Sequence, residues 1–320
     1  MGLDILMVLA GLVALYLGAE GLVRGASSMA LRLGITPLIV GLTVVSFGTS
    51  APELLVSLLG SDDISIGNII GSNIANIALI LGAASLVRPI EVQAQAVRRE
   101  MPIMLVATVL FMVLIANGTL SIFDGIILLA AMVAYLYYMY LQAKKDMAAY
   151  EAELLEELGD VDPTKSTSTK DILFVIGGIL GLAGGAQLMV VGATNIALVF
   201  GISELVIAIS IVAFGTSLPE LATSLVASFR GESDISVGNV IGSNIFNLLF
   251  VMGVVAVALG GITVSSMALQ IDMWVMLAIS ILIWPLLRTG HVLTRVEGCF
   301  LLLFYISYMV SLFLRTQPPA

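Results

Sequence analysis

The sequence has few charged side chains, one cysteine and one histidine, and each shortage excludes a class of protein. Charged residues make up 11% of the 320 residues, whereas about 25% is usual in soluble proteins. With 59% hydrophobic residues, the chain cannot cover a water-facing surface and must contact lipid. Cys299 alone cannot form an internal disulfide, and His291 alone cannot build a multi-histidine metal site. The net charge of −9 argues against nucleic acid as a partner, because phosphate binding requires clustered Lys and Arg.

Several apolar segments are long enough to cross a bilayer as helices. A membrane-spanning helix requires about 20 residues at a rise of about 1.5 Å per residue. The apolar runs between polar breaks predict ten spans, at 3–23, 36–60, 65–87, 101–117, 120–142, 171–199, 203–229, 235–259, 268–287 and 293–314. We therefore expect an all-α integral membrane protein with ten transmembrane helices.

The Lys and Arg residues predict how these spans are oriented. If the N-terminus is outside, twelve of the thirteen basic residues fall in inner loops and only Arg315 falls outside, as the positive-inside rule requires. The one long polar segment, residues 144–170, then lies in the cytoplasm. It contains seven acidic residues and is expected to be a solvated, partly helical linker. We predict a multi-pass protein of the cell membrane with both termini outside.

The sequence contains two copies of one unit. Residues 18–57 match 185–224 at 19 of 40 positions, and residues 63–82 match 234–253 at 12 of 20. The offset rises from 167 to 171 because the second copy has four additional residues around Arg230. The predicted division of the chain is a first repeat over 1–143, the linker over 144–170 and a second repeat over 171–320.

Each copy contains five predicted spans, so the second copy enters the membrane with opposite polarity. Two inverted five-helix repeats, related by an axis in the membrane plane, are typical of secondary transporters, whose sites lie near the bilayer midplane. The alternative is a duplicated scaffold maintained by packing alone. It is disfavoured because the best-matched residues are polar and lie in the middle of spans, where polar groups are costly.

One motif interrupts an apolar span in each copy. Residues 46–53 read SFGTSAPE, and residues 213–220 read AFGTSLPE. Proline has no N–H group and clashes with the preceding turn, so a broken helix is expected at Pro52 and at Pro219. Carbonyl groups released at membrane depth are tolerated only when they are buried in protein or line a wet cavity. A cation can take them as ligands there.

Glu53 and Glu220 place a carboxylate at the same motif position in both copies. A charge near the bilayer centre is expensive, and two facing carboxylates repel each other unless a cation lies between them. The groups available nearby are carboxylate, hydroxyl, amide and carbonyl oxygens, which suit a hard cation such as Ca²⁺ rather than zinc or copper. The sequence thus predicts an oxygen-ligated cation between the copies.

Polar side chains also follow one face of the third and the eighth spans. A spacing of four residues places the members of each set on one helical face. They are Asn68, Ser72 and Asn76 in the third span and Asn239, Ser243 and Asn247 in the eighth. Their neutral oxygens suit Na⁺ or can stabilise a proton carrier, and the alternative role is hydrogen bonding between helices.

These residues resemble the calcium/cation antiporter superfamily, specifically the sodium/calcium exchangers of prokaryotic type. The elements G-T-S-x-P-E and G-S-N-x-x-N look like the two repeats of that family, and the ten-span, inverted layout extends the resemblance over nearly the whole chain. The 27 residues of 144–170 are too few for the regulatory domain of eukaryotic relatives. The resemblance implies a secondary active antiporter that exchanges about three Na⁺ for one Ca²⁺, with no enzymatic activity and no cofactor.

The resemblance also implies a role for each matched residue. Glu53 and Glu220 correspond to the carboxylates that ligate Ca²⁺ and share Na⁺. The other implied ligands are the carbonyls of Thr49 and Thr216 for Ca²⁺, the hydroxyls of Ser50, Ser72, Ser217 and Ser243, the carbonyls of Ser46 and Ala213, and the amides of Asn76 and Asn247. Potassium-dependent relatives carry an acid at the position of Asn247, so K⁺ co-transport is not expected.

Alternative functions remain open at this point. A Ca²⁺/H⁺ antiporter, or another cation exchanger, would use the same glutamates to carry protons. An intramembrane enzyme with two acids would need a close pair that shares a proton, and no further nucleophile or base accompanies Glu53 and Glu220. A channel would conduct a steady current. The expected partners are Na⁺, Ca²⁺ and the lipid bilayer, without nucleic acid and without an obligatory protein partner.

Overall fold

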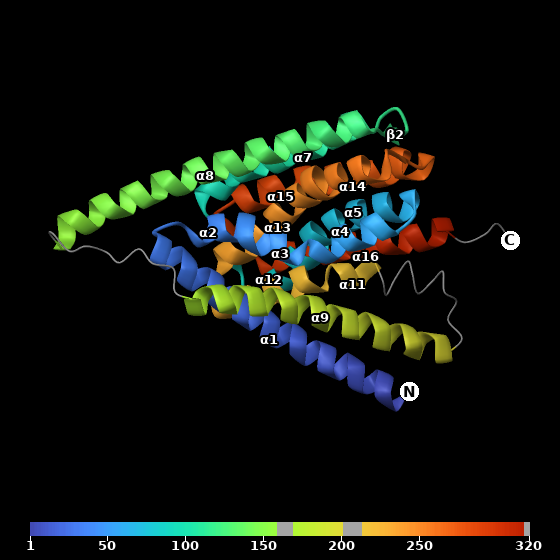
Figure 1. The fold of residues 1–320 in the computed structure, drawn as a ribbon, viewed down its shortest axis with the longest axis horizontal. Coiled ribbons are helices and arrows are strands. Elements are labelled where there is room, and N and C mark those ends of the chain that lie inside the picture. The colour runs from blue at the N-terminus through green and yellow to red at the C-terminus, as the bar shows by residue number, and fades with distance from the viewer. Residues whose placement is uncertain (159–168, 201–212, 317–320) are drawn as a thin grey trace.

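The computed structural model describes residues 1–158, 169–200 and 213–316, which form a bundle of helices (Figure 1). Eight helical stretches among these residues are long and apolar enough to cross a membrane. They are Gly2–Leu33, Pro37–Leu59, Asp62–Val87, Ile122–Met147, Thr169–Val199, Ser233–Leu259, Ala268–Arg288 and Arg295–Arg315. The chain is therefore a multi-pass membrane protein, as its composition predicts.

Two of the predicted spans are not among these eight stretches. The span at 101–117 is the shorter helix α7, Met101–Leu114, which follows the π-helical turn η3, Ala96–Glu100. The span at 203–229 begins outside the described residues. Its described part consists of the short helix α11, Ala213–Thr216, and of α12, Leu218–Arg230.

The first copy begins with the long helix α1, Gly2–Leu33. Two interrupted helices follow it, and each contains a π-helical turn. Their segments are α2 (Pro37–Val40), η1 (Gly41–Val45), α3 (Ser46–Thr49) and α4 (Ala51–Leu59), and then α5 (Asp62–Ala75), η2 (Asn76–Leu81) and α6 (Gly82–Val87). Strands β1 (Ile90–Glu91) and β2 (Thr119–Leu120) flank η3 and α7, and α8 (Ile122–Leu158) ends the copy.

The second copy repeats this order over its described residues. It begins with the long helix α9, Thr169–Val199. After α12 its segments are α13 (Ser233–Phe246), η5 (Asn247–Val251), α14 (Met252–Leu259), β3 (Ile262–Thr263), η6 (Ala268–Asp272), α15 (Met273–Arg288), β4 (Val292–Leu293) and α16 (Arg295–Thr316). The turns η2 and η5 begin at the matched residues Asn76 and Asn247.

Helix α8 is longer than the sequence analysis predicts. It continues to Leu158, past the predicted start of the linker at Lys144. The extension is rich in Ala, Leu, Glu and Lys, which are strong helix formers. Since α9 begins at Thr169, only residues 159–168 of the predicted linker lie outside the described residues.

Helices α1 and α9 lie side by side along one edge of the bundle (Figure 1). Glycines on both helices bring the two backbones into contact. A Cβ atom added to Gly18 would lie 2.7 Å from the Leu182 nitrogen, and one added to Gly178 would lie 2.6 Å from the Leu22 nitrogen. The two long helices therefore pack as a tight pair, which small residues permit.

The short strands join the two copies at both ends of α7. β1 pairs with β4 in antiparallel register, with Ile90 opposite Leu293. β2 pairs with β3 in the same way, with Thr119 opposite Thr263. Each pair therefore joins the strand that precedes the central helix of one copy, α7 or α15, to the strand that follows it in the other.

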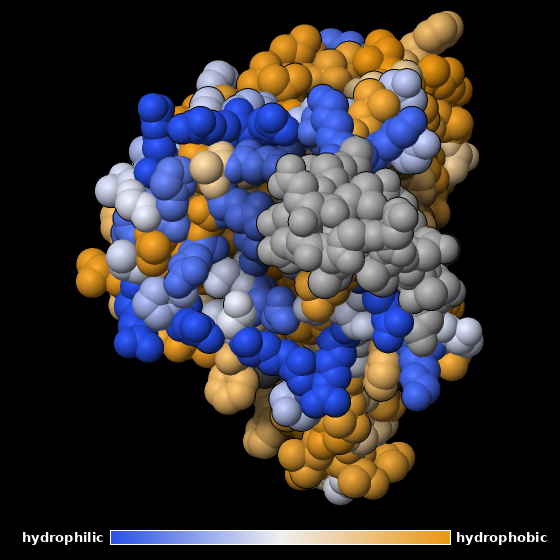
Figure 2. All heavy atoms as spheres, turned by 90° about the vertical axis from the view of Figure 1, so that its left-hand side faces the viewer, coloured by the Kyte–Doolittle hydropathy of each residue, from blue (hydrophilic) through white to orange (hydrophobic). Residues whose placement is uncertain are grey.

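Helices α5 and α13 form the buried centre, and every residue of α13 from Ile235 to Phe246 is buried. Their polar stripes consequently lie in the interior. Figure 2 shows the end of the bundle where α8 ends and α9 begins, and hydrophilic side chains gather over this end while apolar ones lie towards its rim. We call it the β1–β4 end, because Arg88, Arg98, Arg288 and His291 lie around these strands.

Candidate ion-binding site

Glu53 and Glu220 lie in the first turns of α4 and α12, and both side chains are fully buried. Negative charge is favoured at a helix N-terminus by the free backbone N–H groups and the helix dipole. The two carboxylates are close enough to interact electrostatically. The Ser50 hydroxyl donates a 3.3 Å hydrogen bond to Glu220 Oε1, across the boundary between the copies. The acids predicted to meet therefore share one polar interior.

The helix break at each motif is narrower than expected. α3 ends at Thr49, and α4 begins at Ala51 with Pro52 in its first turn. Only Ser50, with φ −83° and ψ 7°, leaves the helical conformation. The Ser46 carbonyl, a predicted cation ligand, accepts a hydrogen bond from the Ser50 N–H at 3.0 Å. Proline fits the start of a new helix, where its missing N–H has no consequence.

Two asparagines connect the motifs of opposite copies. The Thr49 hydroxyl donates to Asn239 Oδ1 at 3.1 Å, and the Asn239 amide donates to the Glu220 carbonyl at 3.3 Å. The Thr216 hydroxyl donates to Asn68 Oδ1 at 3.1 Å, and the Asn68 amide donates to the Glu53 carbonyl at 3.2 Å. Each asparagine therefore fixes the acid-bearing turn of its own copy and the threonine of the other.

The predicted serine hydroxyls also meet across the copies. Ser217 donates to Ser72 at 3.3 Å between their Oγ atoms, and Thr49 Oγ1 lies 3.4 Å from Ser243 Oγ. The Ser46 hydroxyl donates to the backbone carbonyls of Gly41 and Asn239. Ser46 thus fastens α3 to α13.

Two further asparagines of each copy, Asn73 and Asn76 in the first and Asn244 and Asn247 in the second, are also buried. The Asn76 amide donates to Asn244 Oδ1 at 2.9 Å, and the Asn247 amide donates to Asn73 Oδ1 at 3.1 Å. Asn76 and Asn247 each begin a π-helical turn, a distortion that occurs often at functional sites. The turns allow helix α5 and helix α13 to present these amides to each other.

Several buried oxygens of the predicted site residues have no hydrogen-bond partner among the described residues. They are both carboxylate oxygens of Glu53, Oε2 of Glu220, and the Oδ1 atoms of Asn76 and Asn247. Buried polar groups normally find a partner, and a cation would be a suitable partner for this set of oxygens. Because the available ligands are carboxylate, hydroxyl and amide oxygens, they favour a hard cation.

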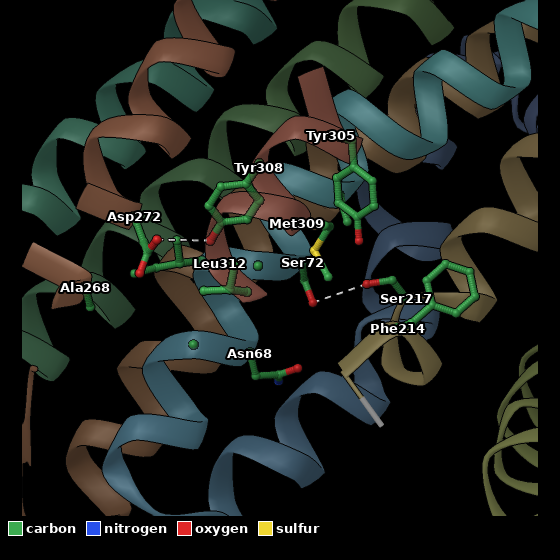
Figure 3. Close-up of a pocket in the computed structure, with 14 residues that line it drawn as sticks. Asn68, Ser72, Phe214, Ser217, Ala268, Asp272, Tyr305, Tyr308, Met309 and Leu312 are labelled. Carbon is green, nitrogen blue, oxygen red and sulfur yellow. Dashed lines mark hydrogen bonds between the residues drawn. The ribbon is translucent and has the colours of Figure 1, made fainter. Parts of the chain in front are cut away.

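A cavity of about 120 Å³ borders this polar interior (Figure 3). Ser72 and Ser217 line it from α5 and from the α11–α12 turn, and Asn68 lies one helical turn away. Tyr305, Tyr308 and Asp272 close its far side.

The structure brings most of the predicted site residues together. Glu53, Glu220, Thr49, Thr216, Ser50, Ser72, Ser217 and Ser243 are all buried at or beside the α3–α4 and α11–α12 turns, and Asn76 and Asn247 are buried where α5 meets α13. Ala213 begins α11, and its side chain lies outside the described part. The prediction omitted Asn68, Asn239, Asn73 and Asn244 as site residues, although the spacing of four had marked the first two.

Known proteins resemble this chain over nearly its whole length. The family described as sodium/calcium exchanger protein matches residues 3–141 and 170–314. The sodium/calcium exchanger MaX1 of Methanosarcina acetivorans is 33% identical over 345 residues, which cover 97% of this chain and 98% of that protein. The inner membrane protein YrbG of Escherichia coli is 39% identical over 281 residues, which cover 86% of each. A structure of the sodium-calcium exchanger NCX_Mj, soaked with 10 mM Na⁺ and no Ca²⁺, matches with a TM-score of 0.83 at 33% identity and covers 97% of this chain and 99% of that chain.

Proposed function

Because this chain belongs to the sodium/calcium exchanger protein family, we propose that it is a secondary active antiporter that exchanges Na⁺ for Ca²⁺ by alternating access. The observation that supports this most directly is the buried, donor-poor set of oxygens around Glu53 and Glu220. The family and its relatives are transporters, so the chain is not an enzyme with a pair of catalytic acids.

Charge balance explains why Ca²⁺ and Na⁺ would compete at this site. Two ionised carboxylates in a low-dielectric interior need about two positive charges nearby. One Ca²⁺ between Glu53 and Glu220 supplies them, and so do Na⁺ ions that use the same carboxylates together with the hydroxyls of Ser50, Ser72, Ser217 and Ser243. An empty, doubly charged site resists moving through the membrane. The carrier would therefore switch between its outward-open and inward-open states only when ions are bound. This restriction couples the two ion fluxes and prevents uncoupled transport.

We infer that the two copies are inverted five-helix repeats. The pairing of β1 with β4 and of β2 with β3 supports this, because a two-fold axis that exchanges β1 with β3 and β2 with β4 turns one pair into the other, at the opposite end of α7. The distribution of Lys and Arg supports a cytoplasmic β1–β4 end and external termini. The tight α1–α9 pair is the element that would slide against the rest of the bundle.

An exchange of about three Na⁺ for one Ca²⁺ moves one net charge per cycle. Transport would then respond to voltage by about 2.3 kcal/mol per 100 mV. A measured reversal potential in vesicles gives the ratio directly, because it depends on how many Na⁺ ions accompany each Ca²⁺.

The experiment that tests the function is ⁴⁵Ca²⁺ uptake into Na⁺-loaded vesicles containing the purified protein. Na⁺, K⁺ and pH are varied separately. Uptake should require the Na⁺ gradient and should not require K⁺. Uptake that ignores Na⁺ but follows a pH gradient would instead establish Ca²⁺/H⁺ antiport, and a steady single-channel current would establish a channel.

Two variants connect the uptake to the site. Glu53→Gln and Glu220→Gln should each abolish uptake, because one carboxylate cannot balance a divalent ion in the interior. Glu91→Gln is the matched control, since Glu91 is exposed in β1. Substantial uptake by either site variant removes that carboxylate from the ion site.

A further inference from the structure

Glu100 and Asp272 occupy the same place in the two copies. Glu100 is the last residue of η3, and Asp272 is the last residue of η6. Each of these five-residue π-helical turns follows a short strand and runs directly into a helix that begins with methionine. The two acids are therefore counterparts, although neither belongs to the repeated motifs.

Asp272 has a fixed cationic partner. Arg315 Nη2 donates to Asp272 Oδ1 at 3.1 Å. The Tyr308 hydroxyl donates to the same oxygen at 3.3 Å (Figure 3). Both partners come from α16. The negative charge of this carboxylate is thus balanced within the protein.

Glu100 lacks such a partner. Its side chain is 0% exposed, and both carboxylate oxygens are without a hydrogen bond among the described residues. The capping contacts of Ser121 with Asp124 and of Thr294 with Glu297 align α8 with α16. With this alignment Tyr135 corresponds to Tyr308, and Gln142 corresponds to Arg315. The first copy therefore has a neutral amide where the second has a guanidinium.

The described groups around Glu100 do not form an ion pair or hydrogen bond with its carboxylate. The Arg99 guanidinium lies within electrostatic reach of the carboxylate, but its Nη1 atom donates to Gln142 Oε1 at 3.0 Å. Tyr135 and Tyr138 lie within electrostatic reach of the carboxylate, and the Tyr135 hydroxyl donates to the Leu42 carbonyl at 3.4 Å.

Gln95 is the remaining polar neighbour of the carboxylate. Its amide nitrogen is buried without a hydrogen-bond acceptor, and an amide can orient a carboxyl group but cannot neutralise it. A metal ion needs several ligands, and Glu100 belongs to no cluster of three or more His, Cys, Asp or Glu among the described residues. A proton needs only one.

We propose that Glu100 is a proton-binding site, occupied as a neutral carboxylic acid when the β1–β4 end is closed. The proton comes from water at that end and forms an O–H bond with a carboxylate oxygen. Burying the ionised form without a partner is strongly unfavourable. When this end opens, water reaches the carboxyl group, and the proton leaves to bulk water.

The effect of this proton on transport rests on the proposed exchange function. The closed form holds one more proton than the open form, so acid at the β1–β4 end favours closure and alkali favours opening. Exchange should slow as the pH on that side falls. The hydrogen bond from Tyr135 to Leu42 gives the pocket a contact with η1, the turn directly before the Ser46–Glu53 motif.

The transport test uses vesicles with the pH varied only on the side that the β1–β4 end faces. Na⁺ and Ca²⁺ are kept saturating, because proton competition at Glu53 and Glu220 is then suppressed. Glu100→Gln should lose this pH dependence and remain as slow as the wild type in acid. Gln142→Arg, which supplies the missing guanidinium, should also lose it, whereas Glu91→Gln should keep it. A wild-type pH profile in both Glu100→Gln and Gln142→Arg overturns the proposal.

Infrared spectroscopy tests the bound proton without transport. Ca²⁺-loaded wild-type protein at neutral pH should show the C=O stretch of a buried neutral carboxyl group, and Glu100→Gln should lack that band. Absence of the band in the wild type, or its persistence in Glu100→Gln, contradicts proton binding. This result does not depend on Na⁺ coupling, so it separates a failure of this proposal from a failure of the proposed function.

Discussion

The Thr49 hydroxyl of one copy donates a 3.1 Å hydrogen bond to the Asn239 side chain of the other. Asn239 in turn holds the carbonyl of Glu220, so a threonine in one motif and an acid in the other are positioned by a single amide. Asn68 makes the reciprocal connection. The site is therefore assembled by contacts between the copies and not within either one.

Truncating these asparagines should weaken ion binding without removing a charge. Asn68→Ala and Asn239→Ala should each raise the Ca²⁺ concentration for half-maximal uptake about tenfold, since losing a buried hydrogen-bond partner costs about 1–3 kcal/mol. The measurement is ⁴⁵Ca²⁺ uptake against Ca²⁺ concentration. Thr108→Val is the control, because the buried Thr108 hydroxyl donates to the Met104 carbonyl of its own helix and to no other described residue. Equal half-saturation in the variants and the control would contradict the positioning role.

Ion binding should stabilise the folded protein. At a Ca²⁺ concentration of 100 times the dissociation constant, the stabilisation is about 2.7 kcal/mol, measured as a rise in Tm in detergent and reversed by a chelator. The double variant Glu53→Gln and Glu220→Gln should show no rise. Without ions it should be at least as stable as the wild type, because neutral amides replace two buried carboxylates. A Ca²⁺-dependent Tm in the double variant would place the ion elsewhere.

The repeated motifs allowed the central polar residues of this protein to be predicted from the sequence. The matched GTSxPE and GSNxxN segments identified Glu53, Glu220 and their hydroxyl neighbours, because duplicated polar residues in apolar spans are hard to explain by packing. Burial of these side chains at the meeting of the copies confirms that they form one interior. Their role as ion ligands stays a prediction.

Other features depend on contacts that spacing along one helix does not reveal. The four-residue spacing in α5 and α13 predicted a polar face on each helix. It did not predict that Asn76 bonds to Asn244 and that Asn247 bonds to Asn73. The expected break at Pro52 proved to be a single residue, because proline is compatible with the first turn of a new helix. The sequence did not predict a role for Glu100, because a single acid beside Arg98 and Arg99 is typical of an exposed loop.

Glu20 and Arg230 form an ion pair at positions where the sequences of the two copies differ. Arg230 Nε donates to Glu20 Oε2 at 2.7 Å, and Arg24 also contacts Glu20 at 2.8 Å. Glu20 matches Gln187 in the other copy, and Arg230 lies in the four-residue insertion. The pair connects α1 to α12. Their counterparts in the other copy, α9 and α4, have no equivalent ion pair among the described residues.

A double-mutant cycle should measure this pair. Both side chains are partly exposed, at 20% and 29%, so the coupling energy between Glu20→Gln and Arg230→Gln should be about 0.5–1 kcal/mol. It is obtained from thermal unfolding in detergent and should fall as salt rises. Glu297→Gln provides a comparison, since this half-buried acid caps α16 and has no arginine partner among the described ion pairs. Additive effects of the two substitutions would mean that the contact does not stabilise this state.

The glycine interface of α1 and α9 should tolerate no side chain. A Cβ atom at Gly178 would lie 2.6 Å from the Leu22 nitrogen and 2.8 Å from the Gly18 carbonyl oxygen. Backbone atoms cannot turn aside as a flexible side chain can, so Gly178→Ala must push the helices apart. The expected loss is about 1–3 kcal/mol of unfolding free energy, measured as a lower Tm.

Gly184 on the same helix provides the matched control for this interface. A Cβ atom there would meet no described atom within 4 Å, so Gly184→Ala should be neutral or stabilising by up to about 1 kcal/mol, because alanine favours the helix. If α1 and α9 move as one unit, Gly178→Ala should also slow exchange more than it lowers ion affinity, since it alters the moving pair and not the ligands. Equal Tm values for the two variants would show that α1 and α9 do not pack backbone to backbone.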